Sequence, residues 1–195
     1  SLATLLKGYG YETRAFHPGE QTSWQRNIAY PRLGFDSFKC GEDMDVPQTE
    51  EHGYVSDDSD FEQIIWEFEH KDESTPLFLF NVTIQNHGSY TVEDYPAEVQ
   101  LADEPGAYPK AEQYLTLANK TDEAFKKLID YFSAQTEPTI LVMFGDHQPS
   151  VEQEFLDKAY GVTQDEMTMA QYMDKFKVPF IIWANYPLTG DSTKI

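Results

Sequence analysis

A carboxylate and an imidazole stand side by side in Gly145-Asp146-His147, directly after an apolar run at residues 139–144 that is typical of a buried strand. In open α/β sheets, ligands bind outside the carboxyl ends of the strands. An oxygen ligand beside a nitrogen ligand suits a divalent cation such as zinc or manganese. The alternative is an ordinary strand-to-loop turn, in which Asp146 caps a helix and His147 lies on the surface.

A second apolar run also ends in polar residues. Residues 76–84 have the continuous apolar pattern of a strand buried on both faces, and Gln85-Asn86-His87-Gly88 follows as a turn-forming sequence. Two predicted central strands therefore end in candidate ligands, His87 and the Asp146-His147 pair. This coincidence favours a site over two unrelated turns.

Predicted strands and helices alternate along the chain. The predicted strands are residues 11–16, 34–38, 76–84, 139–144 and 179–183, and the predicted helices are 1–8, 23–33, 59–71, 114–132 and a stretch within 151–177. This alternation predicts an α/β fold with a mostly parallel central sheet and helices on both faces. A chain of 195 residues with 40% hydrophobic content is long enough for one domain with a sizeable core.

Composition excludes several classes of function. The net charge of −20 argues against a nucleic-acid partner, because binding to a phosphate backbone needs clustered lysine and arginine. No apolar run reaches the length of about 18 residues expected of a membrane span, and no basic leader precedes an apolar stretch. The single cysteine, Cys40, excludes an internal disulfide and a cysteine-built zinc site, and it leaves the compartment open.

Short motifs follow one another in a recognisable order. They are residues 5–13, Phe16-His17, Trp24-Gln25-Arg26-Asn27, Tyr30, residues 33–36, Asn86-His87, Gly145-Asp146-His147 and residues 178–183. In this order the chain resembles the sulfatase-like branch of the alkaline phosphatase superfamily, and above all its lipoteichoic acid synthase (phosphoglycerol transferase) group. The resemblance implies an alkaline-phosphatase-like fold, of which this chain holds an incomplete part.

The resemblance also implies one divalent metal, usually manganese in this group, with zinc, magnesium or calcium as alternatives. The family's ligands are a glutamate, a threonine nucleophile and an Asp-His pair, which matches Asp146 and His147. Its head-group contacts match Trp24, Arg26 and His87. The planar fork of a guanidinium suits phosphate oxygens, an imidazole suits a phosphate or a glycerol hydroxyl, and an indole forms an apolar wall. Without the family, Trp24 fits a core position, Arg26 an ion pair and His87 a turn cap.

The family's N-terminal half, with its glutamate and its nucleophile, has no counterpart in this sequence. Thr4 lies on the helix that leads into Gly8, downstream of the position of the family's nucleophile, and Cys40 lacks the Cys-x-Pro-x-Arg context of sulfatases. We therefore expect residues 1–195 to be a single sulfatase-like domain truncated at both ends, without a catalytic nucleophile. Such a chain should bind its metal weakly and should not turn over.

For the longer protein, the resemblance implies transfer of a phosphoglycerol group through a covalent intermediate on threonine. The implied substrate is a phospholipid or a polyglycerolphosphate-type polymer. The implied location is the extracytoplasmic face of the bacterial cell membrane, with membrane attachment through the missing N-terminal region. Hydrolysis of such a diester, hydrolysis of a sulfate ester, and a non-catalytic binding module are the alternatives. The oligomeric state is left open.

Overall fold

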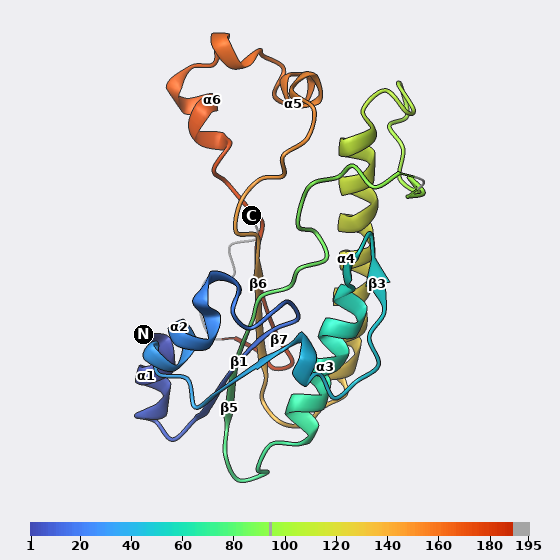
Figure 1. Cartoon of the computed structure of the whole chain (residues 1–195). Helices are drawn as coiled ribbons and strands as arrows, with labels where there is room; N and C mark the ends of the chain where they lie inside the picture. Colours follow the sequence, from blue (N-terminus) through green and yellow to red (C-terminus); the bar gives the residue numbers. More distant parts are fainter. Residues whose placement is uncertain (94, 189–195) are drawn as a thin grey trace. The chain divides into compact units, whose positions relative to one another are not determined.

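The computed structural model describes residues 1–93 and 95–188. The chain forms two compact units, Ser1–His87 with Thr116–Leu128 and Gly88–Leu115 with Ile129–Ile195. Helix α4, Pro109–Ser133, contributes its middle to the first unit and both its ends to the second (Figure 1). Among these described residues, no helix combines the length and the hydropathy of a membrane span.

The first unit is built on a three-stranded parallel sheet. Its strands are β1, Glu12–His17, β2, Ser37–Cys40, and β5, Leu77–Asn81, in the order β2-β1-β5. His17 lies opposite Cys40 and Phe16 opposite Asn81 in the register of the sheet. Because the strands are parallel, their carboxyl ends share one edge of the sheet. The predicted parallel sheet is confirmed in this unit.

Helices α1, Leu2–Lys7, and α2, Arg26–Arg32, pack on one face of this sheet. Five aromatic rings fill the space between α2 and the sheet, with centroids 4.8 to 6.2 Å apart: Tyr30, Phe35, Phe38, Phe78 and Phe80. Aromatic pairs at such separations stabilise a core beyond the area that they bury. Side chains alternate along a strand, so His17 points to the same face as Phe38 and Phe80.

Helix α3, Asp57–Glu69, packs on the opposite face. The Ser56 hydroxyl accepts the Ser59 N–H and caps the helix, as polar N-cap residues do. At its far end, Glu67 is 2% exposed and lies 2.5 Å from Arg14 and 2.8 Å from Lys39. These ion pairs attach α3 to β1 and β2. Helices therefore cover both faces of the sheet, as predicted.

Shorter elements complete the first unit. The segments η1, Ser23–Gln25, and η2, Gly41–Asp43, are single 3-10 turns after β1 and β2. Strands β3, Glu50–Glu51, and β4, Tyr54–Val55, form a small antiparallel pair before α3. This pair was not predicted, because two-residue strands leave no periodic pattern in a sequence.

The second unit contains an antiparallel strand pair. Strands β6, Ile140–Phe144, and β7, Phe180–Ala184, pair along their whole length. Between them the chain forms α5, Gln153–Tyr160, η3, Gln164–Glu166, and α6, Met169–Asp174, which Figure 1 shows as one long excursion. The sequence predicted a strand here and not its direction, because a connection this long can return the chain to either end of a strand.

The expectation of a buried strand at residues 139–144 was wrong for one face of β6. Ile140, Val142 and Phe144 are each about half exposed, at 50%, 50% and 53%. The sequence is apolar on both faces, but the other elements of the second unit cover only one of them. An apolar pattern shows that a strand could be buried on both faces. It does not show that other elements cover both faces.

Polar side chains fix the ends of α4 within the second unit. Both carboxylate oxygens of Glu152 accept backbone N–H groups of Lys110 and Ala111, at 2.8 and 3.0 Å. A carboxylate at this position accepts hydrogen bonds from backbone N–H groups that have no partner within the helix, and it interacts favourably with the positive end of the helix dipole. At the other end, the Asn185 amide donates to the carbonyl of Phe132 at 3.2 Å.

Candidate functional site

His17 is the last residue of β1 and is 3% exposed. Its Nδ1 accepts the Gly19 N–H at 2.8 Å, so the neutral ring carries its proton on Nε2. A Cβ at Gly19 would lie 2.9 Å from Cε1 of His17, and only glycine lets the turn close this tightly. Burial first, and then the charge of Arg26, lowers the pKa of His17 to about 4. At neutral pH this buried ring is an uncharged hydrogen-bond donor.

Arg26 begins α2, and its guanidinium donates to the backbone. Its Nη1 donates to the backbone carbonyl of Glu20 at 3.2 Å. Within residues 1–93 and 95–188, no carboxylate lies within ion-pair distance of this side chain. The chain carries 34 acidic residues against 14 basic ones, so an arginine without a carboxylate partner is an informative exception. The ion-pair interpretation of Arg26 is thereby excluded among the described residues.

Trp24 is 86% exposed, which excludes a core role for its indole. Trp24 and the next residue, Gln25, both have left-handed backbone conformations, with φ of 56° and 53°. Residues with side chains rarely adopt this region, and two in succession store strain. Such strain tends to occur at ligand-binding segments. The turn therefore displays an apolar ring to solvent immediately before Arg26.

His87 ends the turn that follows β5 and is exposed. Its backbone N–H donates to the Ile84 carbonyl at 2.9 Å, which closes the turn. The Tyr54 hydroxyl lies 3.4 Å from Nδ1 of His87, and the two rings meet edge to face with centroids 5.6 Å apart. The Arg26 charge lowers the pKa of His17, and Arg26, His17 and His87 are treated below as one group of the first unit.

The sequence predicted Arg26 and His87 for this group but not His17. The signal that identified His87 was a histidine at the end of a predicted strand, and His17 satisfies the same criterion. It was missed because Pro18 and Gly19 made it look like part of a turn. Its place beside Arg26 depends on α2 folding back over the sheet, which no local pattern shows.

Asp146 and His147 follow β6 in the second unit, with side chains 80% and 77% exposed. Nε2 of His147 lies 3.6 Å from Oδ2 of Asp146, while Nδ1 lies 2.9 Å from the Gln148 carbonyl. When Nδ1–H donates to this carbonyl, Nε2 is the unprotonated ring nitrogen, which is the usual arrangement in a metal-binding histidine. The donor set suits a divalent cation.

The described part of the chain places this Asp-His pair without a larger cluster of ligands. Among the described residues, no group of three or more histidine, cysteine or acidic side chains is arranged to hold a metal ion. The pair fits half of a tetrahedral set. Trp24, Arg26 and His87 belong to the first unit, whereas Asp146 and His147 belong to the second.

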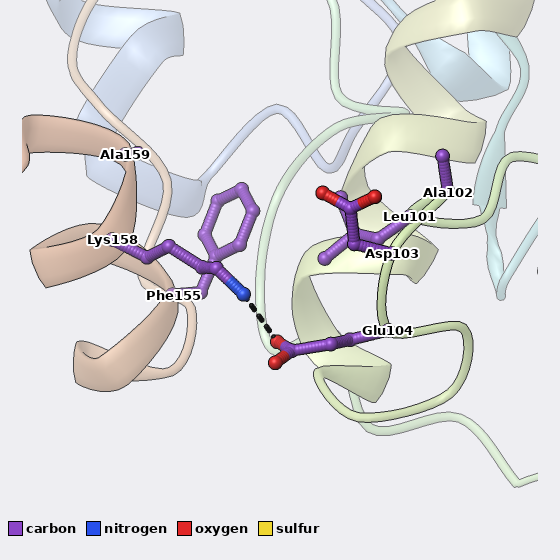
Figure 2. Close-up of a pocket in the computed structure, with 7 residues that line it drawn as sticks. All are labelled: Leu101, Ala102, Asp103, Glu104, Phe155, Lys158 and Ala159. Atoms are coloured by element: carbon purple, nitrogen blue, oxygen red, sulfur yellow. Dashed lines mark hydrogen bonds and ion pairs between the residues drawn. The ribbon is translucent and has the colours of Figure 1, made fainter.

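A cavity of about 220 Å³ lies within the second unit, between residues 101–104 and α5 (Figure 2). Leu101 and Phe155 contribute apolar walls, and Nζ of Lys158 pairs with Glu104 at 2.5 Å. The cavity contains none of the predicted site residues. Its one cation is already matched by a carboxylate, so this cavity is not the candidate site.

The first unit holds a parallel sheet with helices on both faces, and the second unit holds an Asp-His pair directly after β6. The Sulfatase family model matches residues 1–188, and the chain belongs to this family. The predicted resemblance is confirmed, since lipoteichoic acid synthase homologues are among the relatives.

Two relatives match almost the whole chain. A Rhizobium meliloti (strain 1021) protein named for modification of cyclic beta-1,2-glucan is 31% identical over 194 residues, which are 95% of this chain and 29% of the relative. The lipoteichoic acid synthase-like YvgJ of Bacillus subtilis (strain 168) is 28% identical over 181 residues, 91% of this chain and 28% of the relative. The chain thus spans less than a third of the length of either protein.

One solved structure shows the same fold. The Streptococcus pyogenes phosphoglycerol transferase GacH, in complex with sn-glycerol-1-phosphate, superposes with a TM-score of 0.70 at 22% identity. The match covers 90% of this chain and 44% of that one. The predicted alkaline-phosphatase-like α/β fold is therefore confirmed.

Proposed function

We propose that this chain is a portion of an extracytoplasmic, metal-dependent phosphoglycerol transferase or phosphodiesterase that acts on lipid or glycan head groups. The observation that carries the proposal is the guanidinium of Arg26, which has no carboxylate partner among the described residues and acts on His17. In a chain with a net charge of −20, an anion is held only where a local cation is kept available for it.

The residues of the first unit divide the binding of a phosphate ester among them. Arg26 offers a planar fork to two phosphate oxygens. The neutral ring of His17 donates from Nε2, and the exposed ring of His87 meets a further oxygen or a glycerol hydroxyl. Trp24 covers the apolar side of the head group.

Asp146 and His147 are the residues that would hold the metal, with manganese as the first choice and zinc, magnesium or calcium as alternatives. The bound ion would supply Lewis-acid stabilisation of a phosphoryl oxygen. The fit is that of two ligands from a larger set, because one carboxylate oxygen and one imidazole nitrogen face each other. We therefore expect the chain alone to bind the ion weakly and to show no turnover.

The proposed substrate class is a phospholipid or a polyglycerolphosphate-type polymer, and the proposed location is the extracytoplasmic face of a bacterial membrane. GacH is a phosphoglycerol transferase by name and YvgJ is lipoteichoic acid synthase-like by name, which supports this class. The family name supports a second candidate, hydrolysis of a sulfate ester. Phosphate and sulfate esters both present oxygens that a guanidinium binds, so the relative affinities of the chain for phosphate and for sulfate distinguish the two candidates.

The test is titration of sn-glycerol 1-phosphate into the chain, followed by NMR of the imidazole and indole groups. Inorganic sulfate is titrated in parallel. The matched pair of variants is Arg26→Gln and Arg32→Gln, which remove the same charge from the same short helix. Arg32 is exposed in the last turn of α2, at the opposite end of the helix from Arg26.

We expect glycerol phosphate to shift the resonances of Trp24, His17 and His87, with an affinity at least tenfold weaker in Arg26→Gln and nearly unchanged in Arg32→Gln. Tighter binding of sulfate than of glycerol phosphate would favour the sulfatase candidate. An equal loss of affinity in Arg26→Gln and Arg32→Gln would mean that the ligand responds only to the net charge of the chain, and the proposal would then fail.

A further inference from the structure

The hydroxyl of Thr121, on α4, is the meeting point of a polar network in the first unit. It donates to Oδ2 of Asp57 at 2.6 Å and accepts from Nε2 of Gln85 at 3.1 Å and Nδ2 of Asn86 at 2.8 Å. The Leu117 carbonyl, 3.1 Å away, is a longer alternative acceptor. A threonine hydroxyl offers one donor and two acceptor sites, so these contacts use its full capacity. Thr121, Asp57, Gln85 and Asn86 are called the Thr121 network below.

This network is shielded from water. Asp57 is 0% exposed, Gln85 is 1% exposed and Thr121 is 7% exposed. Hydrogen bonds at such positions fix geometry strongly, because a buried polar group that loses its partner cannot turn to solvent. Every member of the network is therefore constrained by the others.

Gln85 is held at both ends of its side-chain amide. Its Oε1 accepts the backbone N–H of Asp57 at 2.9 Å, and its Nε2 donates to the Leu117 carbonyl at 3.1 Å as well as to Thr121. The first residue of the turn is thus attached to the start of α3 and to α4. Thr121 binds the next residue, Asn86, directly.

His87 is the residue that follows these two. Thr121 is connected to it by the backbone of residues 85–87. The Ile84 carbonyl, which accepts the His87 N–H at 2.9 Å, closes the same turn. Anchoring two consecutive residues fixes where the third side chain begins. Small displacements of a binding group are costly, since a misplacement of about 1 Å can reduce a rate about a hundredfold.

We propose that Thr121 is a positioning residue for His87, and that its hydroxyl sets the place of the imidazole toward a phosphate-ester head group. This inference depends on the proposed function of the group that contains Arg26, His17 and His87. It assigns the effect to the hydroxyl and not to the methyl group of the side chain. Conservative substitutions can separate these two parts of threonine.

The test compares Thr121→Val, which keeps the shape and removes the hydroxyl, with Thr121→Ser, which keeps the hydroxyl. Thr121→Cys has a weak donor and gives an intermediate case. Three quantities are measured on each variant: amide hydrogen exchange at Asn86 and His87, the NMR titration of the His87 ring, and the affinity for sn-glycerol 1-phosphate.

We expect Thr121→Val to speed exchange at His87 at least tenfold, to move the titration midpoint of its ring and to weaken the ligand at least tenfold. Thr121→Ser should stay within about twofold of the wild type on all three quantities. If Thr121→Val does not fold, Thr121→Cys must show changes in the same three quantities and in the same direction, with smaller magnitudes. The inference would be overturned if the wild type, Thr121→Ser and the folded variant that lacks the hydroxyl (valine or, failing that, cysteine) gave equal hydrogen exchange and equal ring titration at His87.

The two ideas fail in different ways. If the wild type does not bind glycerol phosphate, the proposed function fails, whereas exchange and ring titration in the ligand-free chain still decide the role of Thr121 for the turn. A purely structural role would lower the thermal stability of Thr121→Val and leave the His87 ring titration unchanged. That result counts against positioning.

Discussion

His17 is buried within reach of the Arg26 charge, and the two side chains differ in protonation state. Burial, and after it the guanidinium charge, lowers the pKa of His17 to about 4, so the imidazole stays neutral while the guanidinium remains charged. One residue then supplies the charge and the other a directed N–H. Two fixed positive charges at the same place would repel each other in the empty site.

Removing the guanidinium should raise the pKa of His17. In Arg26→Gln we expect a value above about 4 and still below the ordinary 6.5, because burial, the larger cause, remains. Histidine-detected NMR titration measures it, with Arg32→Gln as the matched control. A midpoint unchanged at about 4 would assign the whole shift to burial.

His17 should also make the chain sensitive to acid. Its folded pKa lies below the unfolded value of 6.5, so its contribution to stability is present above pH 6.5 and is lost as pH falls toward 4. A shift of this size corresponds to ~3 kcal/mol. Urea unfolding across this window should show a smaller loss of stability in His17→Gln than in the wild type. Parallel curves for the two proteins would contradict this assignment.

The buried carboxyl groups at the start of α3 should act in the opposite direction. Burial raises the pKa of Asp57 to about 6, and burial together with the Asp57 charge raises that of Asp60 well above its usual range. The folded chain then binds these protons more tightly than the unfolded chain. The stability that they contribute is present below about pH 4 and is lost as pH rises through the folded values. For Asp57 this amounts to ~3 kcal/mol.

Asp60→Asn is therefore expected to be more stable than the wild type at alkaline pH and close to it near pH 4. The substitution keeps an oxygen for the Asn81 amide, which donates to Asp60. Asp58→Asn is the matched control, since Asp58 lies in the same helical turn, is half-exposed and pairs with Lys127. Unfolding midpoints over the pH range measure the difference. Equal pH dependence in the two variants would show that Asp60 is ionised in the folded chain.

Glu67 should be the most sensitive acidic residue for folding of the first unit. Glu67→Gln leaves Arg14 and Lys39 without their shared buried partner, and we expect a loss of about 3–5 kcal/mol in the free energy of unfolding. Glu73→Gln, at an exposed position outside the helices, should stay within about 0.5 kcal/mol. Chemical unfolding of both variants gives the comparison. A loss below about 1 kcal/mol would mean that solvent already screens the pair.

The sequence was a good guide to local structure and a weaker one to what the elements bring together. Apolar runs located β1, β5, β6 and β7, because burial imposes periodicity on each strand separately. The antiparallel direction of β7 and the exposed face of β6 depend on long connections and on neighbouring elements. These leave no mark in the strands themselves.

The candidate site divides in the same way. The sequence predicted His87, Asp146 and His147 as site residues because each follows a strand, and Trp24 and Arg26 because they match a family motif. His17 and Thr121 were missed. Thr121 is 64 residues from Asp57, and only the packing of α4 on α3 places the hydroxyl between Asp57 and the turn. The left-handed backbone at Trp24 could not be predicted from the sequence either, since tryptophan has no preference for that conformation.

Manganese should bind weakly and at one place. We expect Mn²⁺ titration by calorimetry to give a dissociation constant in the micromolar to millimolar range, because the described residues supply two ligands where a structural site has four. Binding should weaken as the pH is lowered, because protons compete with the metal for its ligands. Zinc should bind more tightly than manganese at the same pair, following the usual order of affinities.

The variants decide whether the ion uses this pair. Asp146→Ala/His147→Ala should abolish binding, whereas Asp103→Ala/Asp165→Ala, which removes two exposed carboxylates of the same unit, should leave it unchanged. Paramagnetic broadening by Mn²⁺ places the ion independently, and it should be strongest at residues 145–148. Equal calorimetric curves for both double variants would mean that the ion binds through the general acidity of a chain with a net charge of −20.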